Sequence, residues 1–205
     1  MSKSSAQWKQ DHFNDTYVQQ AQQQGYASRA VFKLKQIQQK DKILKSSMTV
    51  IDLGAAPGGW CQYTAEVIGD TGRIFALDLL PLQISDKNIY FLQGDFHEQA
   101  VVDELLLEMG SRKADVVLSD MAPNLSGVKA IDIPKSIYLA ELAFDLCGQV
   151  LTKQGTLLVK VFQGEGFDSL VKTLRQAFGQ VSIRKPQASS AKSKEIYLLA
   201  KNYKL

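Results

Sequence analysis

The stretch Thr49-Val-Ile-Asp-Leu-Gly-Ala-Ala-Pro-Gly-Gly-Trp60 decides the fold of this chain. It begins as an apolar, β-branched run, continues into a glycine-rich turn and ends in a helical pattern, so it predicts a strand, a loop and a helix. In an open parallel sheet, small molecules bind beyond the carboxyl ends of the strands, where glycines let the backbone approach them closely. The spacing Gly54-x-x-x-Gly58-Gly59 differs from G-x-G-x-x-G and therefore argues against NAD as the ligand.

Predicted strands and helices alternate along the rest of the chain. Further strands are expected at 73–77, 88–93, 114–119, 155–159, 181–184 and 195–200, and helices at 8–24, after Ser28, and at 60–68, 98–109, 132–150 and 167–178. This alternation is typical of an α/β fold with a mostly parallel, seven-stranded sheet and helices on both faces. The loop between the last two strands has only about ten residues, too few for a helical crossover, so the last strand should be antiparallel.

Charged side chains stand where the predicted strands end. Asp78 ends the second strand, Asp95 and Asp120 follow the third and fourth, and Lys160 follows the fifth. Parallel strands share one carboxyl edge, so we expect these side chains there, and the reversed last strand should bring Glu195 to the same edge. An acid at the tip of the second strand binds ribose hydroxyls in nucleotide-binding folds. An acid after the third could accept a hydrogen bond from the adenine amine.

These carboxylates favour a cationic, nucleoside-like ligand. Each aspartate alone could equally cap a helix or solvate a loop, so the inference depends on their combination. No G-x-x-x-x-G-K-[ST] motif is present, and an acidic pocket would repel a triphosphate. S-adenosylmethionine fits better, because it has a cationic sulfonium and amino group, a ribose and an adenine amine.

Composition predicts one domain with basic ends. The chain has 205 residues, 45% of them hydrophobic, and a net charge of +3. Residues 29–45 carry six Lys or Arg against one acid and residues 184–204 six against one, whereas residues 46–183 carry ten against seventeen. The basic ends could hold a polyanion, although solvated lysines explain such runs equally well. Within the single domain 1–205, we expect a helical, basic extension at 1–45 and a core at 46–205 that holds the ligand site.

Several classes of protein are disfavoured by the sequence. The longest apolar runs are strand-sized and the first residues are polar, so we expect neither a membrane span nor a signal peptide, and a cytoplasmic location. Cys61 and Cys147 both fall in helical patterns, without a C-x-x-C motif. The sequence therefore suggests neither a disulfide scaffold nor a metal site.

Four segments resemble the FtsJ/RrmJ family of RNA ribose 2'-O-methyltransferases. They are Ser28–Leu34, Asp52–Trp60, Ser119–Asn124 and Lys160–Gly164, and the resemblance runs nearly end to end. It implies a Rossmann-like class I methyltransferase fold that uses S-adenosylmethionine. It also implies the catalytic residues Lys33, Asp120, Lys160 and Glu195, and the predicted cofactor-binding residues are Gly54, Gly58, Gly59, Trp60, Asp78, Asp95 and Asp120. Without the resemblance, the helical position of Lys33 would predict a solvent-facing side chain.

The resemblance also implies a substrate. The motifs most resemble those of family members that methylate a uridine ribose of 23S rRNA, so we expect this rRNA, in the 50S subunit or its precursor, as the partner. Residues 1–45 would then be an RNA-binding extension and residues 46–205 the catalytic core. We expect a monomer that binds neither DNA nor membrane. A tRNA ribose as the substrate, or a non-catalytic RNA-binding assembly factor, stays an open alternative. A cytosine C5 enzyme would need a loop cysteine nucleophile, and a base amino-methyltransferase would need an aromatic residue that Asp120-Met-Ala-Pro-Asn124 lacks.

Overall fold

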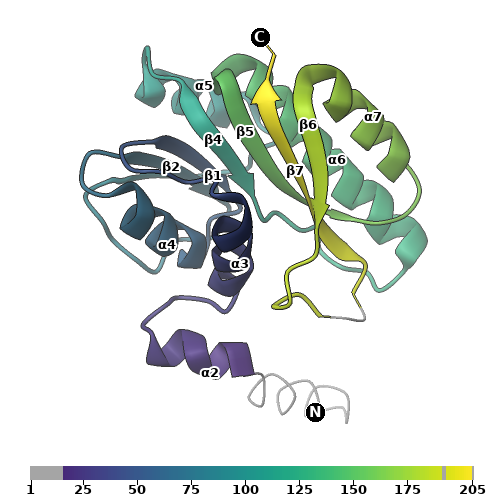
Figure 1. Cartoon of the computed structure of the whole chain (residues 1–205), viewed down its shortest axis with the longest axis horizontal. Coiled ribbons are helices and arrows are strands. Elements are labelled where there is room, and N and C mark those ends of the chain that lie inside the picture. Colours follow the sequence, from purple (N-terminus) through teal and green to yellow (C-terminus); the bar gives the residue numbers. More distant parts are fainter. Residues whose placement is uncertain (1–15, 191–192, 205) are drawn as a thin grey trace.

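The computed structural model describes residues 16–190 and 193–204, and these form a seven-stranded sheet covered by helices (Figure 1). The strands are β1 Thr49–Leu53, β2 Arg73–Asp78, β3 Ile89–Gln93, β4 Ala114–Ser119, β5 Leu151–Phe162, β6 Phe178–Arg184 and β7 Glu195–Tyr203. The helices are α2 Thr16–Gln23, α3 Val31–Asp41, α4 Gly59–Ile68, α5 Gln99–Met109, α6 Lys129–Val150 and α7 Phe167–Ala177. The predicted α/β class is confirmed.

The strand order is β3-β2-β1-β4-β5-β7-β6. Strands β1 to β5 pair in parallel, whereas β7 pairs antiparallel with both β5 and β6. The order reverses beside β1, and ligands bind open α/β sheets at such a switch point. Since β7 runs against its neighbours, its first residue, Glu195, lies at the edge where β1, β2 and β4 end. The predicted antiparallel last strand and its consequence for Glu195 are therefore confirmed.

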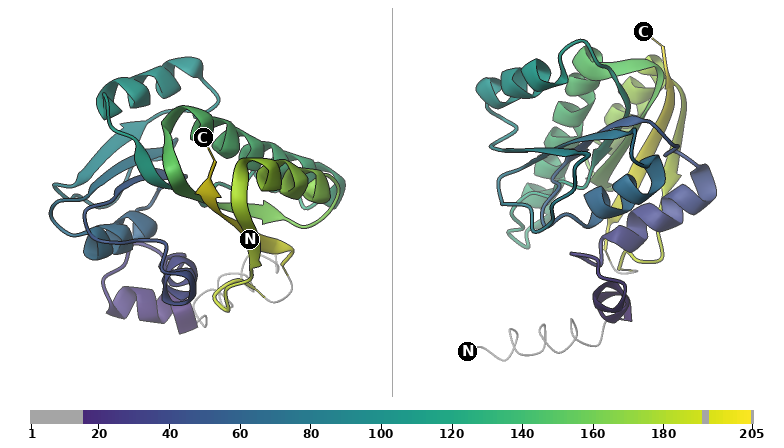
Figure 2. Two further views of the ribbon diagram at one scale, coloured as in Figure 1. Left: turned by 45° about the horizontal axis from the view of Figure 1, so that its top comes forward. Right: turned by 90° about the vertical axis from the view of Figure 1, so that its left-hand side faces the viewer.

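Two apolar layers hold the helices on the sheet. Alternate strand residues point to opposite faces, so Val50 packs with α3 and α4 while Ile51 packs with α5, α6 and α7. Figure 2 shows the same division, with α3 and α4 on one side of the sheet and α6 and α7 on the other. Buried strands with helices on both faces explain why the strand sequences are nearly continuously apolar.

Helix α3 is part of this core although it belongs to the predicted extension 1–45. Its Leu34 and Ile37 are buried with residues of α4 and the sheet. Helix α2 packs more peripherally, through a small cluster of Ala21, Val31 and Phe32 with Ala188. The predicted helix 8–24 is described only from Thr16, and its earlier part lies outside the described residues.

Several boundaries differ from those predicted, and contacts in the structure explain the start of α6 and the end of β5. Helix α6 begins at Lys129 rather than at Asp132, because the Asp132 carboxylate accepts hydrogen bonds from the backbone N–H groups of Ser126 and Gly127 and braces the turn before the helix. Strand β5 continues to Phe162, because its end pairs with β7, so Lys160 lies inside the strand and not after it. Among the described residues, no helix is long and apolar enough to cross a membrane.

Candidate active site

A cavity of about 560 Å³ lies at the carboxyl edge of the sheet. Its lining includes four of the predicted cofactor residues, Gly54, Asp78, Asp95 and Asp120. They come from the ends of four different strands, which the topology places side by side. The volume is within the range of small-molecule sites, roughly 300–1,000 Å³. The cavity therefore has the place and the acidic lining that the sequence predicts, and a size that suits a small molecule.

The glycine-rich turn is held firmly at the cavity wall. Gly54 has φ +76°, and a Cβ there would lie 2.9 Å from Cγ of Met121, so the close approach of the two turns requires glycine. The Asp78 carboxylate accepts hydrogen bonds from the backbone N–H groups of Ala56 at 2.8 Å and Leu80 at 2.9 Å. These contacts fix the acid that ends β2 against the turn that follows β1.

Gly58, Gly59 and Trp60 do not belong to the cavity lining. The Trp60 indole is buried, donates a hydrogen bond to the Ala30 carbonyl at 2.8 Å and packs beside Tyr197. A Cβ on Gly59 would lie 2.9 Å from the Ser28 hydroxyl oxygen. Trp60 and Gly59 seat the start of α3 on α4, whereas a Cβ on Gly58 would meet Ile84 and Leu82. Contact of these three residues with a cofactor stays a prediction.

Asp95, the acid after β3, is paired with a nearby histidine. Its Oδ1 accepts hydrogen bonds from the backbone N–H of His97 at 2.9 Å and from His97 Nδ1 at 2.6 Å. The backbone hydrogen bond from His97 is the main reason why the pKa of Asp95 is lowered. The His97 ring stacks on Tyr138, with ring centroids 5.7 Å apart, and both side chains line the cavity. Asp95 is thus a charged acceptor at this end of the cavity.

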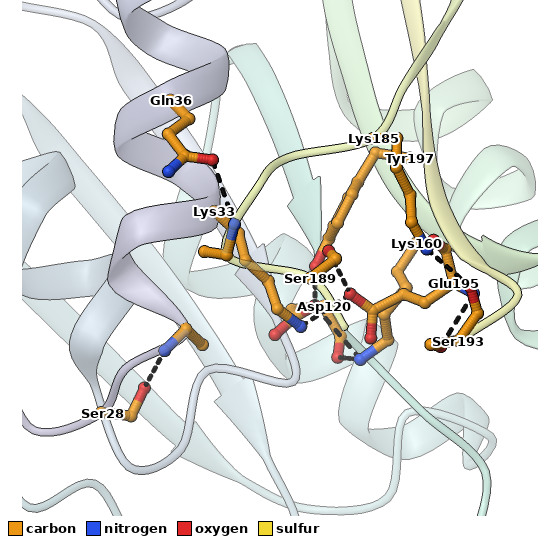
Figure 3. A network of polar contacts seen from close by, with 12 residues as sticks. Ser28, Lys33, Gln36, Asp120, Lys160, Lys185, Ser189, Ser193, Glu195 and Tyr197 are labelled. Carbon is orange, nitrogen blue, oxygen red and sulfur yellow. Dashed lines mark hydrogen bonds and ion pairs between the residues drawn. The ribbon is translucent and has the colours of Figure 1, made fainter. Parts of the chain in front are cut away.

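The four predicted catalytic residues lie together beside the cavity (Figure 3). Lys33 Nζ is 2.7 Å from Glu195 Oε1, and Lys160 Nζ is 3.1 Å from Asp120 Oδ1. Lys160 also donates a hydrogen bond to the backbone carbonyl of Asp120. Lys33 is 8% exposed, in contrast to the solvent-facing position that its helical flank predicts, because α3 is packed on α4 and the loop before β7.

Tyr197 is a polar member of this cluster that the sequence analysis missed. Its hydroxyl donates a hydrogen bond to Asp120 Oδ1 at 2.6 Å, and Lys33 Nζ lies 6.0 Å from its ring centroid. Burial, followed by the charge of Asp120, raises the pKa of Tyr197 well above its usual value, so the hydroxyl stays protonated. The available signal was its place two residues after Glu195, since alternate residues of a strand share a face.

Asp52, near the end of β1, is a further carboxyl group, and it does not belong to the cavity lining. It is fully buried, and its Oδ2 accepts a hydrogen bond from the Cys61 thiol at 3.1 Å, while Oδ1 has no partner among the described residues. Burial raises the pKa of Asp52 to about 7, and the charges of Asp120 and Asp78 add to the shift. Asp52 therefore carries its proton over much of the acidic range.

Residues 26–203 match the model of the FtsJ-like methyltransferase family, which is most of the chain. The chain belongs to the FtsJ-like methyltransferase family. It is also similar to a structure described as a ribosomal RNA methyltransferase from Plasmodium falciparum, with 30% identity and a TM-score of 0.78, over 87% of this chain and 98% of that one. A fibrillarin from Aeropyrum pernix, solved with natively bound S-adenosylmethionine, shares the fold at 16% identity and a TM-score of 0.56, over 83% of this chain and 73% of that one.

The methyl donor of this FtsJ-like methyltransferase is S-adenosylmethionine, and the cavity suits it. Asp78, Asp95 and Asp120 give the lining a negative charge that complements the cationic sulfonium and amino group. Gly54 lines the cavity without a side chain of its own, and its backbone lies close to Met121. Asp78 would hold the ribose hydroxyls and Asp95 the adenine amine, while Asp120 borders both the cavity and the cluster of Lys33, Lys160 and Glu195.

Proposed function

We propose that this FtsJ-like methyltransferase methylates the 2' hydroxyl of a uridine ribose in 23S rRNA. One observation carries the proposal: Asp120 lines the cofactor cavity and also contacts Lys160, so the cavity and the lysine–carboxylate cluster share a residue. A ribose hydroxyl held by the cluster would face the methyl donor. Orientation of this kind can supply much of the rate of a displacement reaction.

The cluster offers a separate task to each of its members. When bound, the cofactor supplies a methyl group on a positively charged sulfur. Lys160 accepts the proton of the ribose hydroxyl, and Asp120 holds Lys160 through both its carboxylate and its backbone carbonyl. Lys33 and Glu195 hold the ribose. An ammonium group has no lone pair, so Lys160 can act as the acceptor only in its neutral amine form.

The RNA partner is inferred from the charge around the cluster. Besides the buried Lys33, helix α3 carries Lys35 and Lys40, and the second basic segment, 184–204, includes the loop that contacts α3. Lys35, Lys40 and the cations of this segment would neutralise phosphates, so binding should weaken steeply with salt. Arg184 is less available for this task, because it pairs with Asp41. We infer that the substrate is 23S rRNA in the 50S subunit or its precursor, and that the protein acts in the cytoplasm as a monomer.

The position of the modification can be tested directly. Ribose methylation should be mapped across total RNA from cells with and without this protein. We expect one methylated uridine in the large-subunit rRNA to disappear, and restoration of the gene to return it. Loss confined to tRNA would redirect the proposal to another RNA ribose, and an unchanged map would favour the non-catalytic assembly factor.

The role of Lys160 requires a test on the isolated protein. In single-turnover assays with saturating RNA and S-adenosylmethionine, Lys160→Ala should slow methyl transfer by about a hundredfold or more. Lys153→Ala is the matched control, because Lys153 is an exposed lysine of the same strand, β5. A nearly normal rate for Lys160→Ala would end its assignment as the proton acceptor.

A further inference from the structure

Glu195 is held from two sides, by α3 and by the loop before β7. Lys33 Nζ lies 2.7 Å from Glu195 Oε1, and the Ser189 hydroxyl donates a hydrogen bond to the same oxygen at 2.8 Å (Figure 3). Ser189 is 6% exposed, so its hydroxyl is largely shielded from water. Two donors of different chemistry thus meet one carboxylate oxygen at the edge of the catalytic cluster.

The loop is closed around this contact by its own hydrogen bonds. Lys185 Nζ donates to the backbone carbonyls of Ser193 and Glu195, each at 2.6 Å. The backbone N–H of Glu195 donates to the Ser193 hydroxyl at 3.0 Å. The backbone of Glu195 is therefore fixed independently of Ser189, which leaves Ser189 to act on the carboxylate.

Helix α3 also determines where Ser189 lies. Gln36, one turn after Lys33, accepts a hydrogen bond from the Ala188 backbone N–H at 3.2 Å through its side-chain oxygen. Ala188 is buried against Val31 and Phe32 of the same helix. One helix therefore supplies the first donor to Glu195 directly and places the second through Gln36.

We propose that Ser189 is a positioning residue that orients the Glu195 carboxylate for methyl transfer, and that Gln36 fixes Ser189. This inference rests on the proposed function of the cluster. A glutamate paired with a lysine alone can turn about its side-chain bonds, because an ammonium group is a compact charge on a flexible stem. The Ser189 hydroxyl adds a second, directional donor, which restricts the carboxylate to one orientation.

The kinetic test compares three variants of neighbouring residues. Ser189→Ala should lower kcat by about tenfold to a hundredfold, because a misplaced carboxylate no longer aligns the ribose, while KM for RNA and the melting temperature change little. Ser189→Thr keeps the hydroxyl and should recover most of kcat. Ser190→Ala is the matched control, because Ser190 is exposed in the same loop. A kcat of Ser189→Ala equal to that of the wild type would overturn the proposal.

A crystal structure of Ser189→Ala separates this inference from the proposed function. We expect the Glu195 carboxylate to rotate or to occupy two conformers, while the backbone around it stays in place. An unmoved carboxylate would overturn the positioning role whatever the kinetics show. If the wild-type protein does not methylate RNA, the proposed function fails, and the position of Glu195 in this crystal still decides whether Ser189 orients it.

Discussion

Lys33 Nζ and Glu195 Oε1 are 2.7 Å apart, so a helix near the start of the fold and its last strand meet in one ion pair. Both side chains are mostly buried, at 11% and 15% exposure. A buried ion pair is a poor source of stability, since the desolvation of both charges offsets their attraction. The pair lies beside a cavity and a second lysine–carboxylate pair, so a role in the proposed reaction explains it better than a contribution to stability does.

Removal of one partner of this pair should cost both activity and stability. Lys33→Met leaves the Glu195 carboxylate buried without its cation, and we expect a loss of about 3–5 kcal/mol in the free energy of unfolding. Glu195→Gln should lower the free energy of unfolding less in the Lys33→Met background than in the wild type. Urea denaturation of the four proteins of this double-mutant cycle measures the difference. Lys40→Met, at an exposed position of α3, is the control. Additive effects would show that the two charges do not interact.

The Tyr197 hydroxyl should affect the rate more than the fold. Tyr197→Phe keeps the ring that packs on Trp60 and removes the donor to Asp120 Oδ1. We expect methyl transfer to slow by about tenfold or more, because Asp120 loses a hydrogen bond to its charged carboxylate. Single-turnover kinetics measure the rate, and thermal melts measure the effect on the fold. Tyr203→Phe, on the same strand but away from the cluster, should leave both unchanged.

The ion pair between Asp41 and Arg184 should stabilise the docking of α3 in a pH-dependent way. Arg184 donates to both Asp41 oxygens, at 2.7 and 2.6 Å, and this hydrogen bonding lowers the pKa of Asp41. A lowered folded-state pKa gives stability that is present above the unfolded pKa, near 3.8, and lost as the pH falls through the folded value. Asp41→Asn should therefore cost about 2 kcal/mol at pH 7 and progressively less below pH 4.

Urea denaturation at several pH values measures this dependence. Asp70→Asn serves as the control, because Asp70 forms an exposed ion pair with Lys87 whose contribution should be small. If the free energies of unfolding of wild type and Asp41→Asn differed by a constant amount from pH 7 to pH 3, the lowered pKa of Asp41 would be contradicted.

Asp52 should produce the opposite dependence on pH. Its pKa in the folded protein is about 7, against 3.8 for an ordinary aspartate, so folding favours the protonated form. The free energy of unfolding should fall as the pH rises from about 4 to about 7, by up to about 1.4 kcal/mol per pH unit, and then level off. Asp52→Asn removes this slope. The free energy of unfolding of the variant should therefore rise relative to that of the wild type between about pH 4 and about pH 7. Thermal melts that shift in parallel for both proteins would exclude a raised pKa.

The acidic residues that line the cavity could be predicted from the sequence, because the ends of strands and the glycine turn are recognisable from local sequence patterns. Asp78, Asp95 and Asp120 lie where the ends of parallel strands must meet, and the reversed last strand brings Glu195 to them. Lys33 illustrates the limit of local reasoning. Its helical position predicts exposure, and its burial depends on a loop that is remote in sequence.

Tyr197 and Trp60 show the same limit for aromatic residues. A tyrosine in an apolar strand is ordinarily part of the core. Its place two residues after Glu195 puts Tyr197 on the same face of the strand, but does not reveal that Asp120 accepts its hydrogen bond. The Trp60 side chain packs away from the cavity, because the buried indole N–H finds its acceptor in the Ala30 carbonyl. Partners that come from other elements decide the orientation of both rings.

The position of β7 between β5 and β6 has a consequence for protein synthesis. The ends of β1 to β4 and helix α6, which line the cavity, leave the ribosome before β7 does, whereas Glu195 and Tyr197 arrive only with that strand. A nascent chain that stops short of β7 would therefore hold every described residue of the cavity lining but would lack one of the two lysine–carboxylate pairs. If Glu195 acts in methyl transfer as proposed, methylation should require a chain whose translation has passed β7.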